Sequence, residues 1–127
     1  MRVVAANVGA ARRELPDVPL LLENAAFTFE WPDGEMDEAA FYTEIAERTG
    51  CDLLLDLGNL HANAVNRGED PRAVLRAYPL ERVGMIHIAG GALEGGFYAD
   101  THAHAVPEAV FDLLAEALLR AGATPVL

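Results

Sequence analysis

Short apolar runs that end in polar residues, separated by helical patterns, constrain the fold of this chain more than any other feature. Three such runs are Val18–Asn24, Cys51–Asn59 and Val83–Gly90, and they follow one another at intervals of about 30 residues, the length of one strand–helix unit. Continuous apolar runs of this kind are typical of strands buried on both faces of a parallel sheet. A fourth strand is expected to begin in the segment 124–127.

Helical patterns fill the intervals between these runs. Asp37 and the pair Asp70–Pro71 are typical helix starts, and Gly50 and Gly122 are typical helix stops. We therefore expect helices at 1–14, 37–49, 70–78 and 107–120, a turn at 32–34, and a glycine-rich loop after residue 90 that leads to Asp100–His104.

This alternation predicts an α/β fold with parallel strands. It leaves two closures open, a doubly wound sheet and a (β/α)₈ TIM barrel. No Gly-x-Gly-x-x-Gly motif follows a strand, so nothing supports a dinucleotide-binding fold. Polar residues at the carboxyl ends of the strands favour the barrel, whose active sites lie there. Because a whole barrel needs about 200–250 residues, residues 1–127 are expected to form a single domain of parallel (β/α) units, about half a barrel with roughly four strands.

The composition excludes several classes of function. All nine basic residues are Arg, and the absence of Lys and Ser removes a serine nucleophile, a Schiff-base lysine and a phosphate-loop lysine. A formal net charge of −11 argues against a nucleic-acid partner. No apolar run approaches the roughly 18–20 residues that span a bilayer, so no membrane segment is expected. The single cysteine, Cys51, permits no intrachain disulfide, fits a reducing cytoplasm and is expected to be a buried structural thiol.

The carboxyl ends of the expected strands carry side chains that bind metals. If the strands are parallel neighbours, these side chains converge on one rim of the sheet. Carboxylates, imidazoles and an amide oxygen form a mixed ligand set that suits Fe(II), Mn(II) or Zn(II). The candidate ligands are Glu23, Asp56, Asn59, His87, Asp100 and His102.

Each of these residues also has a purely structural interpretation. Glu23 can cap a helix or form a salt bridge, and a lone histidine in an apolar strand, such as His87, usually bonds to the backbone. Asp100–His102 can be a turn with an exposed histidine. His61 and His104 fall in expected loops, where histidines are usually solvated. A metal or acid–base site is favoured over these structural interpretations because all the strand ends are expected to converge on one rim.

Aromatic residues alternate in the segment after the first strand, at Phe27, Phe29 and Trp31. Packing against the first helix of the sheet explains this spacing most simply. The alternation is also compatible with the lining of a pocket.

A set of ordered motifs resembles the multinuclear non-haem iron-dependent oxidative enzymes (MNIO). The resemblance covers nearly all of residues 15–127. It is carried by the segments Leu20–Asn24, Glu47–Asn59, Ala64–Pro71, Leu80–Gly90 and Asp100–Pro107.

The resemblance implies a (β/α)₈ barrel related to the xylose-isomerase-like metal enzymes, holding two or three iron ions. Members of that family use O₂ to oxidise residues, typically Cys, in ribosomally made precursor peptides, often with a partner protein that delivers the peptide. Carried over by position, the implied iron ligands are Glu23 as a bridging carboxylate, Asp56, Asn59, His87, Asp100 and His102. The implied supporting residues are Asn24, His61 and His104. No catalytic residue beyond the metal ligands is implied.

The chain also departs from the family pattern. The early histidine-bearing strands of the family have no counterpart here, and the acidic ligand expected just beyond Pro125–Leu127 is absent. The chain is therefore expected to be a partial copy, truncated at both ends relative to the family, with an incomplete site and little activity in isolation. Two alternatives remain open at this point. One is a non-catalytic half-barrel that associates with itself through open edges, and the other is a divalent-metal barrel of the sugar-isomerase or endonuclease kind.

Overall fold

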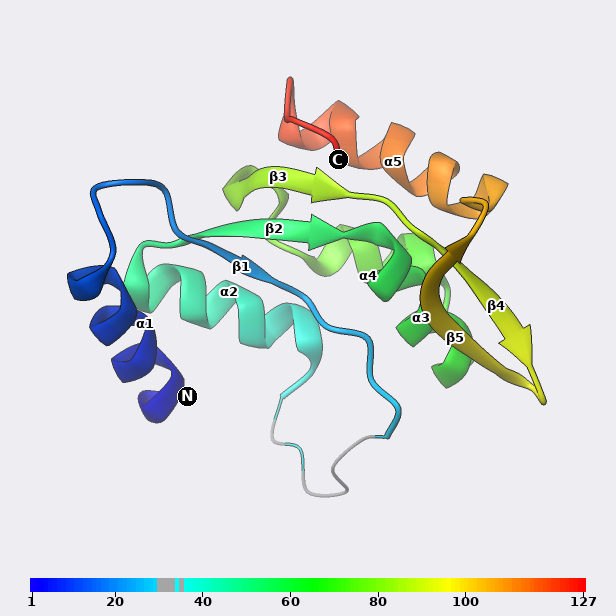
Figure 1. The fold of residues 1–127 in the computed structure, drawn as a ribbon, viewed down its shortest axis with the longest axis horizontal. Helices are drawn as coiled ribbons and strands as arrows, with labels where there is room; N and C mark the ends of the chain where they lie inside the picture. The colour runs from blue at the N-terminus through cyan, green and yellow to red at the C-terminus, as the bar shows by residue number, and fades with distance from the viewer. Residues whose placement is uncertain (30–33, 35) are drawn as a thin grey trace.

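The computed structural model describes residues 1–29, 34 and 36–127. Its helices and strands, in chain order, are α1 (Arg2–Glu14), β1 (Leu21–Glu23), α2 (Glu38–Thr49), β2 (Asp52–Asp56), α3 (Leu57–Arg67), α4 (Pro71–Ala77), the 3₁₀ turn η1 (Leu80–Arg82), β3 (Val83–His87), β4 (Gly90–Glu94), β5 (Phe97–His104) and α5 (Glu108–Ala121). Figure 1 shows β1, β2 and β3 side by side, with the β4–β5 hairpin beyond their carboxyl ends.

The central sheet is parallel and has the order β1-β2-β3. At its carboxyl edge, Asp56 of β2 is in register with His87 of β3. Val126 extends the sheet through a parallel bridge to Ile86, on the other side of β3. The predicted α/β class with parallel strands is therefore confirmed, and the expected fourth strand begins beside β3. That the chain forms about half of a barrel, with roughly four strands, stays a prediction.

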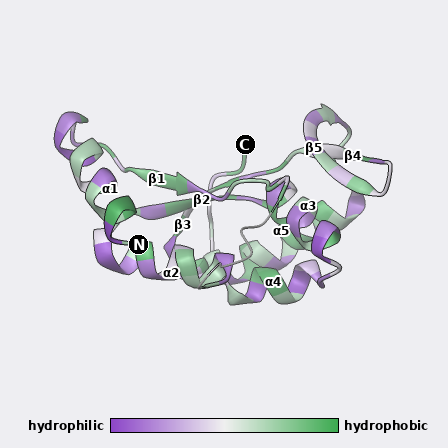
Figure 2. Ribbon diagram, turned by 90° about the horizontal axis from the view of Figure 1, so that it is seen from below, coloured by the Kyte–Doolittle hydropathy of each residue, from purple (hydrophilic) through white to green (hydrophobic). Residues whose placement is uncertain are grey.

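Helices bury one face of this sheet much more than the other. In β2, Leu53 and Leu55 are each 1% exposed, whereas Leu54 between them is half-buried. Figure 2 shows α2 and α4 on one side of the strands. Because successive side chains of a strand point to opposite faces, Leu53 and Leu55 pack on the helices and Leu54 points to the other side. The described residues therefore bury one face of the sheet, not both as the apolar runs predicted.

The expected helices are confirmed, and their bounds follow from their caps. Asp37 accepts a hydrogen bond from the Ala40 amide at 2.7 Å, and Asp70 accepts one from the Arg72 amide at 3.0 Å. Gly50 ends α2 with a φ of 68°, a left-handed conformation that glycine adopts without steric cost. The first and last expected helices appear as α1 and α5.

Helix α3 is a correction to the sequence prediction, which continued the second strand to Asn59. The strand ends at Asp56, whose side chain caps α3 by accepting a hydrogen bond from the Asn59 amide at 2.9 Å. Gly58 and the asparagines of this segment are weak helix formers, so local propensity favours a loop. Tertiary packing overrides that preference, because Leu57 and Leu60 are fully buried in the core.

The glycine-rich segment is a second correction, because it forms an antiparallel hairpin, β4–β5, and not a loop. A Cβ atom at Gly90 would lie 2.2 Å from the carbonyl oxygen of His104, so this close approach of the two strands requires glycine. Gly95 and Gly96 both have positive φ and make the turn. The hairpin thereby carries Asp100 and His102 on a strand.

Other expectations concern single residues. Cys51 is fully buried and forms no disulfide, as predicted. The expected turn at 32–34 and the side chain of Trp31 fall largely outside the described residues. Among the described residues, none of the helices combines the length and the apolar character needed to cross a bilayer.

Candidate metal centre

Asp56 and His87 form the centre of the candidate site. They are paired at the carboxyl ends of neighbouring strands, and Asp56 Oδ2 lies 2.6 Å from His87 Nδ1. The Asp56 side chain is 0% exposed, and His87 is 23% exposed. An acid that ends a buried strand needs a partner, because an unpaired buried carboxylate is costly. The imidazole of His87 is that partner.

The backbone and side chain of Asp56 are held in place by two asparagines. Asn24 accepts a hydrogen bond from the Asp56 amide at 2.7 Å and donates one to the Asp56 carbonyl at 2.9 Å. Asn59 donates its side-chain amide to the Asn24 carbonyl at 2.8 Å. The supporting role expected of Asn24 stays a prediction. The ligand role expected of Asn59 stays a prediction.

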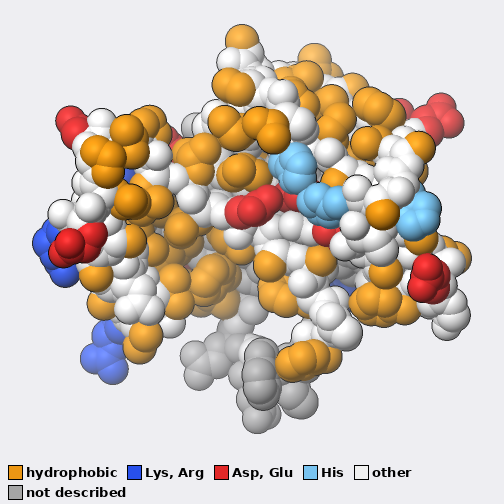
Figure 3. Space-filling model, viewed as in Figure 1, with side chains coloured by type: hydrophobic (Ala, Val, Ile, Leu, Met, Phe, Trp, Pro, Cys, Tyr) orange, Lys and Arg blue, Asp and Glu red, His pale blue; other side chains and the backbone are white. Residues whose placement is uncertain are grey.

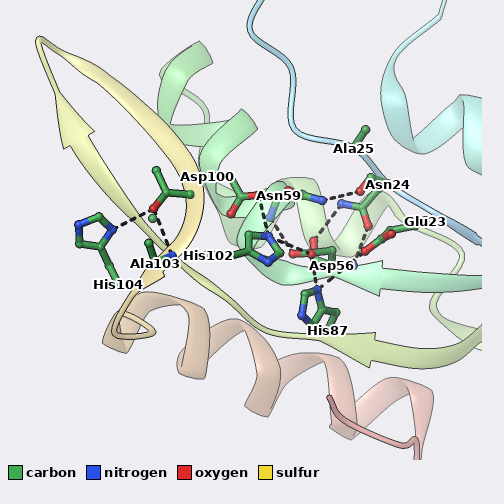
Figure 4. Close-up of polar contacts among 12 residues, drawn as sticks. Glu23, Asn24, Ala25, Asp56, Asn59, His87, Asp100, His102, Ala103 and His104 are labelled. Carbon is green, nitrogen blue, oxygen red and sulfur yellow. Dashed lines mark hydrogen bonds and ion pairs between the residues drawn. The ribbon is translucent and has the colours of Figure 1, made fainter.

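His102 reaches the same place from the hairpin. Its Nε2 lies 3.9 Å from Asp56 Oδ2 and 2.8 Å from Asp100 Oδ2. One ligand atom each from Asp56, His87 and His102 lie within 4.8 Å of one another. Figure 4 shows these side chains converging from β2, β3 and β5, and Figure 3 shows histidines beside acidic side chains on this face of the molecule.

The backbone at His102 is strained. Its φ is 54°, and within the described part of the chain it is the sole non-glycine residue with positive φ. Left-handed backbone costs an ordinary residue roughly 1–2 kcal/mol. Strain of this kind concentrates at functional sites, where the surrounding structure enforces it. Here the conformation places the His102 ring beside Asp100 and Asp56.

Glu23 and Asp100 flank the cluster on opposite sides. Glu23 Oε1 lies 3.8 Å from His87 Nδ1, and the Glu23 side chain is half-exposed. The Asp100 side chain is only 9% exposed, and its Oδ1 is buried without a hydrogen-bond partner among the described residues. An orphaned buried oxygen costs about 1–3 kcal/mol. A cation or a donor at Asp100 Oδ1 would remove that cost.

The other two histidines lie outside the cluster. His104 is exposed, and its Nδ1 lies 2.9 Å from the hydroxyl of Thr101. His61 was expected to be solvated, but it lies on α3 with 9% exposure, edge-to-face against Tyr98 at 5.0 Å between ring centroids. Burial lowers the pKa of His61, so its ring is neutral at pH 7. The prediction of a solvated His61 was wrong because helix α3, which contains His61, was not predicted from the sequence.

Two further asparagines on α3, Asn63 and Asn66, were missed by the sequence analysis. Asn63 accepts from the amide of Phe27 and donates to the carbonyl of Ala25, each at 2.9 Å. Asn66 accepts from the Tyr98 amide at 2.7 Å and donates to its carbonyl at 2.9 Å. With Asn59 they occupy one helix face at spacings of four and three, which is the sequence signal that identifies them.

The donor set fits a divalent transition-metal ion. Two imidazoles and one carboxylate are the ligands of many non-haem Fe(II) sites. Neighbouring ligands of an ion bound at about 2.1 Å lie about 3 Å apart, and the distances from Asp56 Oδ2 to His87 and His102 are 2.6 and 3.9 Å. The orphaned Asp100 Oδ1 adds an oxygen donor beside them.

Comparison with known proteins places the chain in a family. The sequence profile described as "RiPP precursor modification enzyme MbnB/TglH/ChrH" matches residues 1–127. A protein of Streptomyces avermitilis named "UPF0276 protein" is 47% identical over 114 residues, which are 90% of this chain and 23% of that protein. Proteins of the same name from Chromobacterium violaceum and Caulobacter vibrioides are 43% and 41% identical, over 85% and 96% of this chain and 39% and 43% of their own lengths.

The chain thus spans less than half the length of these relatives. The relatives and the profile belong to the same family as the MNIO enzymes that the sequence motifs resemble. This chain therefore belongs to the MbnB/TglH/ChrH family of RiPP precursor modification enzymes.

Proposed function

We propose that this chain carries part of the iron centre of an O₂-using enzyme that oxidises residues such as Cys in a ribosomally synthesised precursor peptide. The meeting of Asp56, His87 and His102 is the observation that carries the proposal. Two imidazoles and one carboxylate on three separate strands form a site that leaves positions open for O₂ and substrate. Family membership supports the peptide as the substrate class.

The proposed ligands divide into two groups around this cluster. Asp56, His87 and His102 hold one ion. Glu23, beside His87, and Asp100, beside His102, would hold the further ions of the two or three irons that the resemblance implies. Asn59 is the remaining proposed ligand. Its side-chain amide donates to the Asn24 carbonyl, and the Asn24 side chain accepts from the Asp56 amide, so Asn24 connects Asn59 with Asp56.

The protein residues bind and orient in this mechanism. His87 Nδ1 and Asp56 Oδ2 lie 2.6 Å apart, within hydrogen-bond distance, and both atoms would be available as ligands to a bound iron ion. Glu23 Oε1, half-exposed and 3.8 Å from His87 Nδ1, places a second carboxylate beside this pair and in contact with solvent. Asn24 and Asn59 keep Asp56 in its orientation throughout. When bound, ferrous iron supplies the electron transfer to O₂ that side chains cannot perform.

Residues 1–127 would form one partial (β/α)₈ domain. Because the chain spans less than half the length of its relatives, the isolated chain is expected to bind iron but to turn over poorly. A partner protein that delivers the peptide is also part of the proposal, on the strength of the resemblance. The low cysteine content, with Cys51 alone, is in keeping with the reducing, cytoplasmic setting that is also part of the proposal.

Anaerobic Fe(II) titration followed by metal analysis tests the ligand assignment. The unsubstituted chain is expected to retain iron through gel filtration, whereas His87→Ala and Glu23→Ala retain less, with the larger loss for His87→Ala. His104→Ala is the matched control, because this exposed histidine lies outside the cluster. Equal iron in the chain and in the His87→Ala variant contradicts the proposal.

A second candidate function is a non-catalytic module that associates with itself. The half-buried face of the sheet, which includes Leu54 and Met85, favours it, since exposed apolar sheet surface promotes association. Mass in solution together with iron content separates the candidates. A metal-free dimer supports the second candidate, and an iron-loaded chain of any mass supports the first.

A further inference from the structure

A groove lies between the segment after β1 and the hairpin strand β5. It has a volume of about 270 Å³. Phe27 forms one wall, Phe97 and Tyr98 form the other, and Ala62 of α3 lines the groove between them. Phe27 and Phe97 are 39% and 38% exposed, so their apolar surface is available to a ligand.

Both walls are fixed by the asparagines of α3. Asn63 holds the backbone of Phe27 on one side, and Asn66 holds the amide and carbonyl of Tyr98 on the other. Arg67 lies over the Phe27 ring at 5.7 Å from its centroid. The groove is therefore largely preformed, which reduces the entropy lost when a ligand binds.

The inner end of the groove meets the candidate metal centre. Asp100 lines the groove, and its Oδ2 lies 2.8 Å from Nε2 of His102, one of the clustered ligands. The Asp100 side chain is more than nine-tenths buried, and its Oδ1 has no partner within the described part of the chain. A group seated in the groove thus lies next to the metal cluster.

The size and chemistry of the groove indicate which kind of side chain it can bind. Pockets for drug-sized ligands are typically about 300–1,000 Å³, so a groove of about 270 Å³ suits a single large side chain. The three aromatic side chains in these two walls favour an aromatic ring through edge-to-face and stacked contacts. The carboxylate of Asp100 disfavours an acidic side chain at the inner end.

We infer that the groove is a specificity pocket for a large uncharged side chain, preferably aromatic, on the peptide residue adjacent to the one brought to the metal centre. The inference rests on the proposed function, because that function supplies the peptide substrate. Asn63 and Asn66 are positioning residues that set the width of the pocket. Asp100 lines the groove and contacts His102 of the metal cluster, so occupancy of the pocket fixes which peptide residue reaches the metal.

Two short peptides test this inference by NMR titration of the zinc-loaded chain, with Zn(II) as a redox-silent metal. The probes are acetyl-Gly-Phe-Cys-Gly-amide and acetyl-Gly-Asp-Cys-Gly-amide. The Phe peptide is expected to shift the amide signals of Tyr98 and Ala99 and to bind about tenfold more tightly than the Asp peptide. The substitution Phe97→Ala should weaken binding of the Phe peptide about tenfold, the factor typical of a lost aromatic contact.

Two further variants keep the test decisive. Phe111→Ala is the matched control, because Phe111 is a half-exposed phenylalanine of α5 that does not line the groove. Ala62→Leu fills the groove and should abolish the preference for the Phe peptide. Equal binding of both peptides, or equal weakening by Phe97→Ala and Phe111→Ala, overturns the inference.

Zinc content, measured in the same samples, separates this inference from the proposed function. Zinc retained without a preference for the Phe peptide overturns the pocket and leaves the metal centre standing. Selective binding of the Phe peptide by a chain that holds no zinc supports the pocket and contradicts the proposed function.

Discussion

The imidazole rings of His87 and His102 lie 5.1 Å apart between centroids, although His87 ends a strand of the parallel sheet and His102 belongs to the hairpin. The contact joins two sheets between which the described residues make no backbone pairing. Its geometry depends on the left-handed backbone of His102, which places the ring over Asp56. The hairpin is therefore part of the candidate centre as much as the parallel strands are.

Substitution of His102 separates stability from metal binding. His102→Gly and His102→Ala both remove the ring, so both should lower metal affinity equally. Glycine also adopts the positive φ without steric cost. The free energy of unfolding of the glycine variant should therefore be about 1 kcal/mol higher than that of the alanine variant. Urea unfolding of the two metal-free variants measures the difference. A glycine variant that is no more stable than the alanine variant would show that the backbone at residue 102 is unstrained.

Two substitutions of Asp56 distinguish its two roles. Asp56→Asn keeps an oxygen that can cap α3 but removes the negative charge beside His87, so metal affinity should fall at least tenfold with little loss of stability. Asp56→Ala should in addition lose about 1 kcal/mol of stability with the cap. Isothermal titration with Zn(II) and thermal unfolding measure the two effects. Full metal affinity in Asp56→Asn would remove Asp56 from the ligand set.

Asn24 is expected to be the structural residue whose loss disturbs the centre most. It is 1% exposed, and its side chain makes two hydrogen bonds to the backbone of Asp56, whereas its backbone carbonyl accepts one from Asn59. Asn24→Ala leaves buried groups unpaired and should lower the free energy of unfolding by about 3 kcal/mol. Asn7→Ala, on the exposed face of α1, is the control and should change it by less than about 0.5 kcal/mol. Similar losses in both variants would contradict the proposed anchoring.

Alkaline pH should destabilise the fold through Tyr42. Burial, and then the charge of Glu38, raise the pKa of Tyr42 from 10.0 to about 12. Because the folded state holds this proton more tightly than the unfolded state does, its contribution is complete below pH 10 and is lost as pH rises through about 12.

The substitution Tyr42→Phe checks this. It should make the decline in unfolding free energy between pH 10 and 12 shallower. At neutral pH it should cost about 1 kcal/mol, because the hydroxyl donates to the Glu23 carbonyl at 2.9 Å. Urea titrations across the alkaline range measure both effects, and an unchanged slope would exclude Tyr42 as the source.

Regular patterns made much of this fold predictable. The leucine run 53–55 and the caps at Asp37 and Asp70 locate β2, α2 and α4, because burial and capping act locally. Convergence of Asp56 and His87 follows from parallel pairing alone. These features need no knowledge of distant contacts.

Features set by tertiary contact were not predictable in the same way. Helix α3 forms from residues of weak helix propensity because Leu57 and Leu60 are buried, and the hairpin depends on close approach at Gly90. Because residues 57–67 were not predicted to be helical, the shared face of Asn63 and Asn66 and the burial of His61 were not recognised. The motif resemblance named His102 as a ligand, but its strained backbone appears only in three dimensions.

Ring-nitrogen NMR of the four histidines, with and without one equivalent of Zn(II), tests most directly that Asp56, His87 and His102 share a metal ion. The predicted result is a large change in the ring ¹⁵N shifts of His87 and His102, with His61 and His104 unchanged as internal controls. No change at His87 and His102, or an equal change at His104, would contradict the metal centre described above.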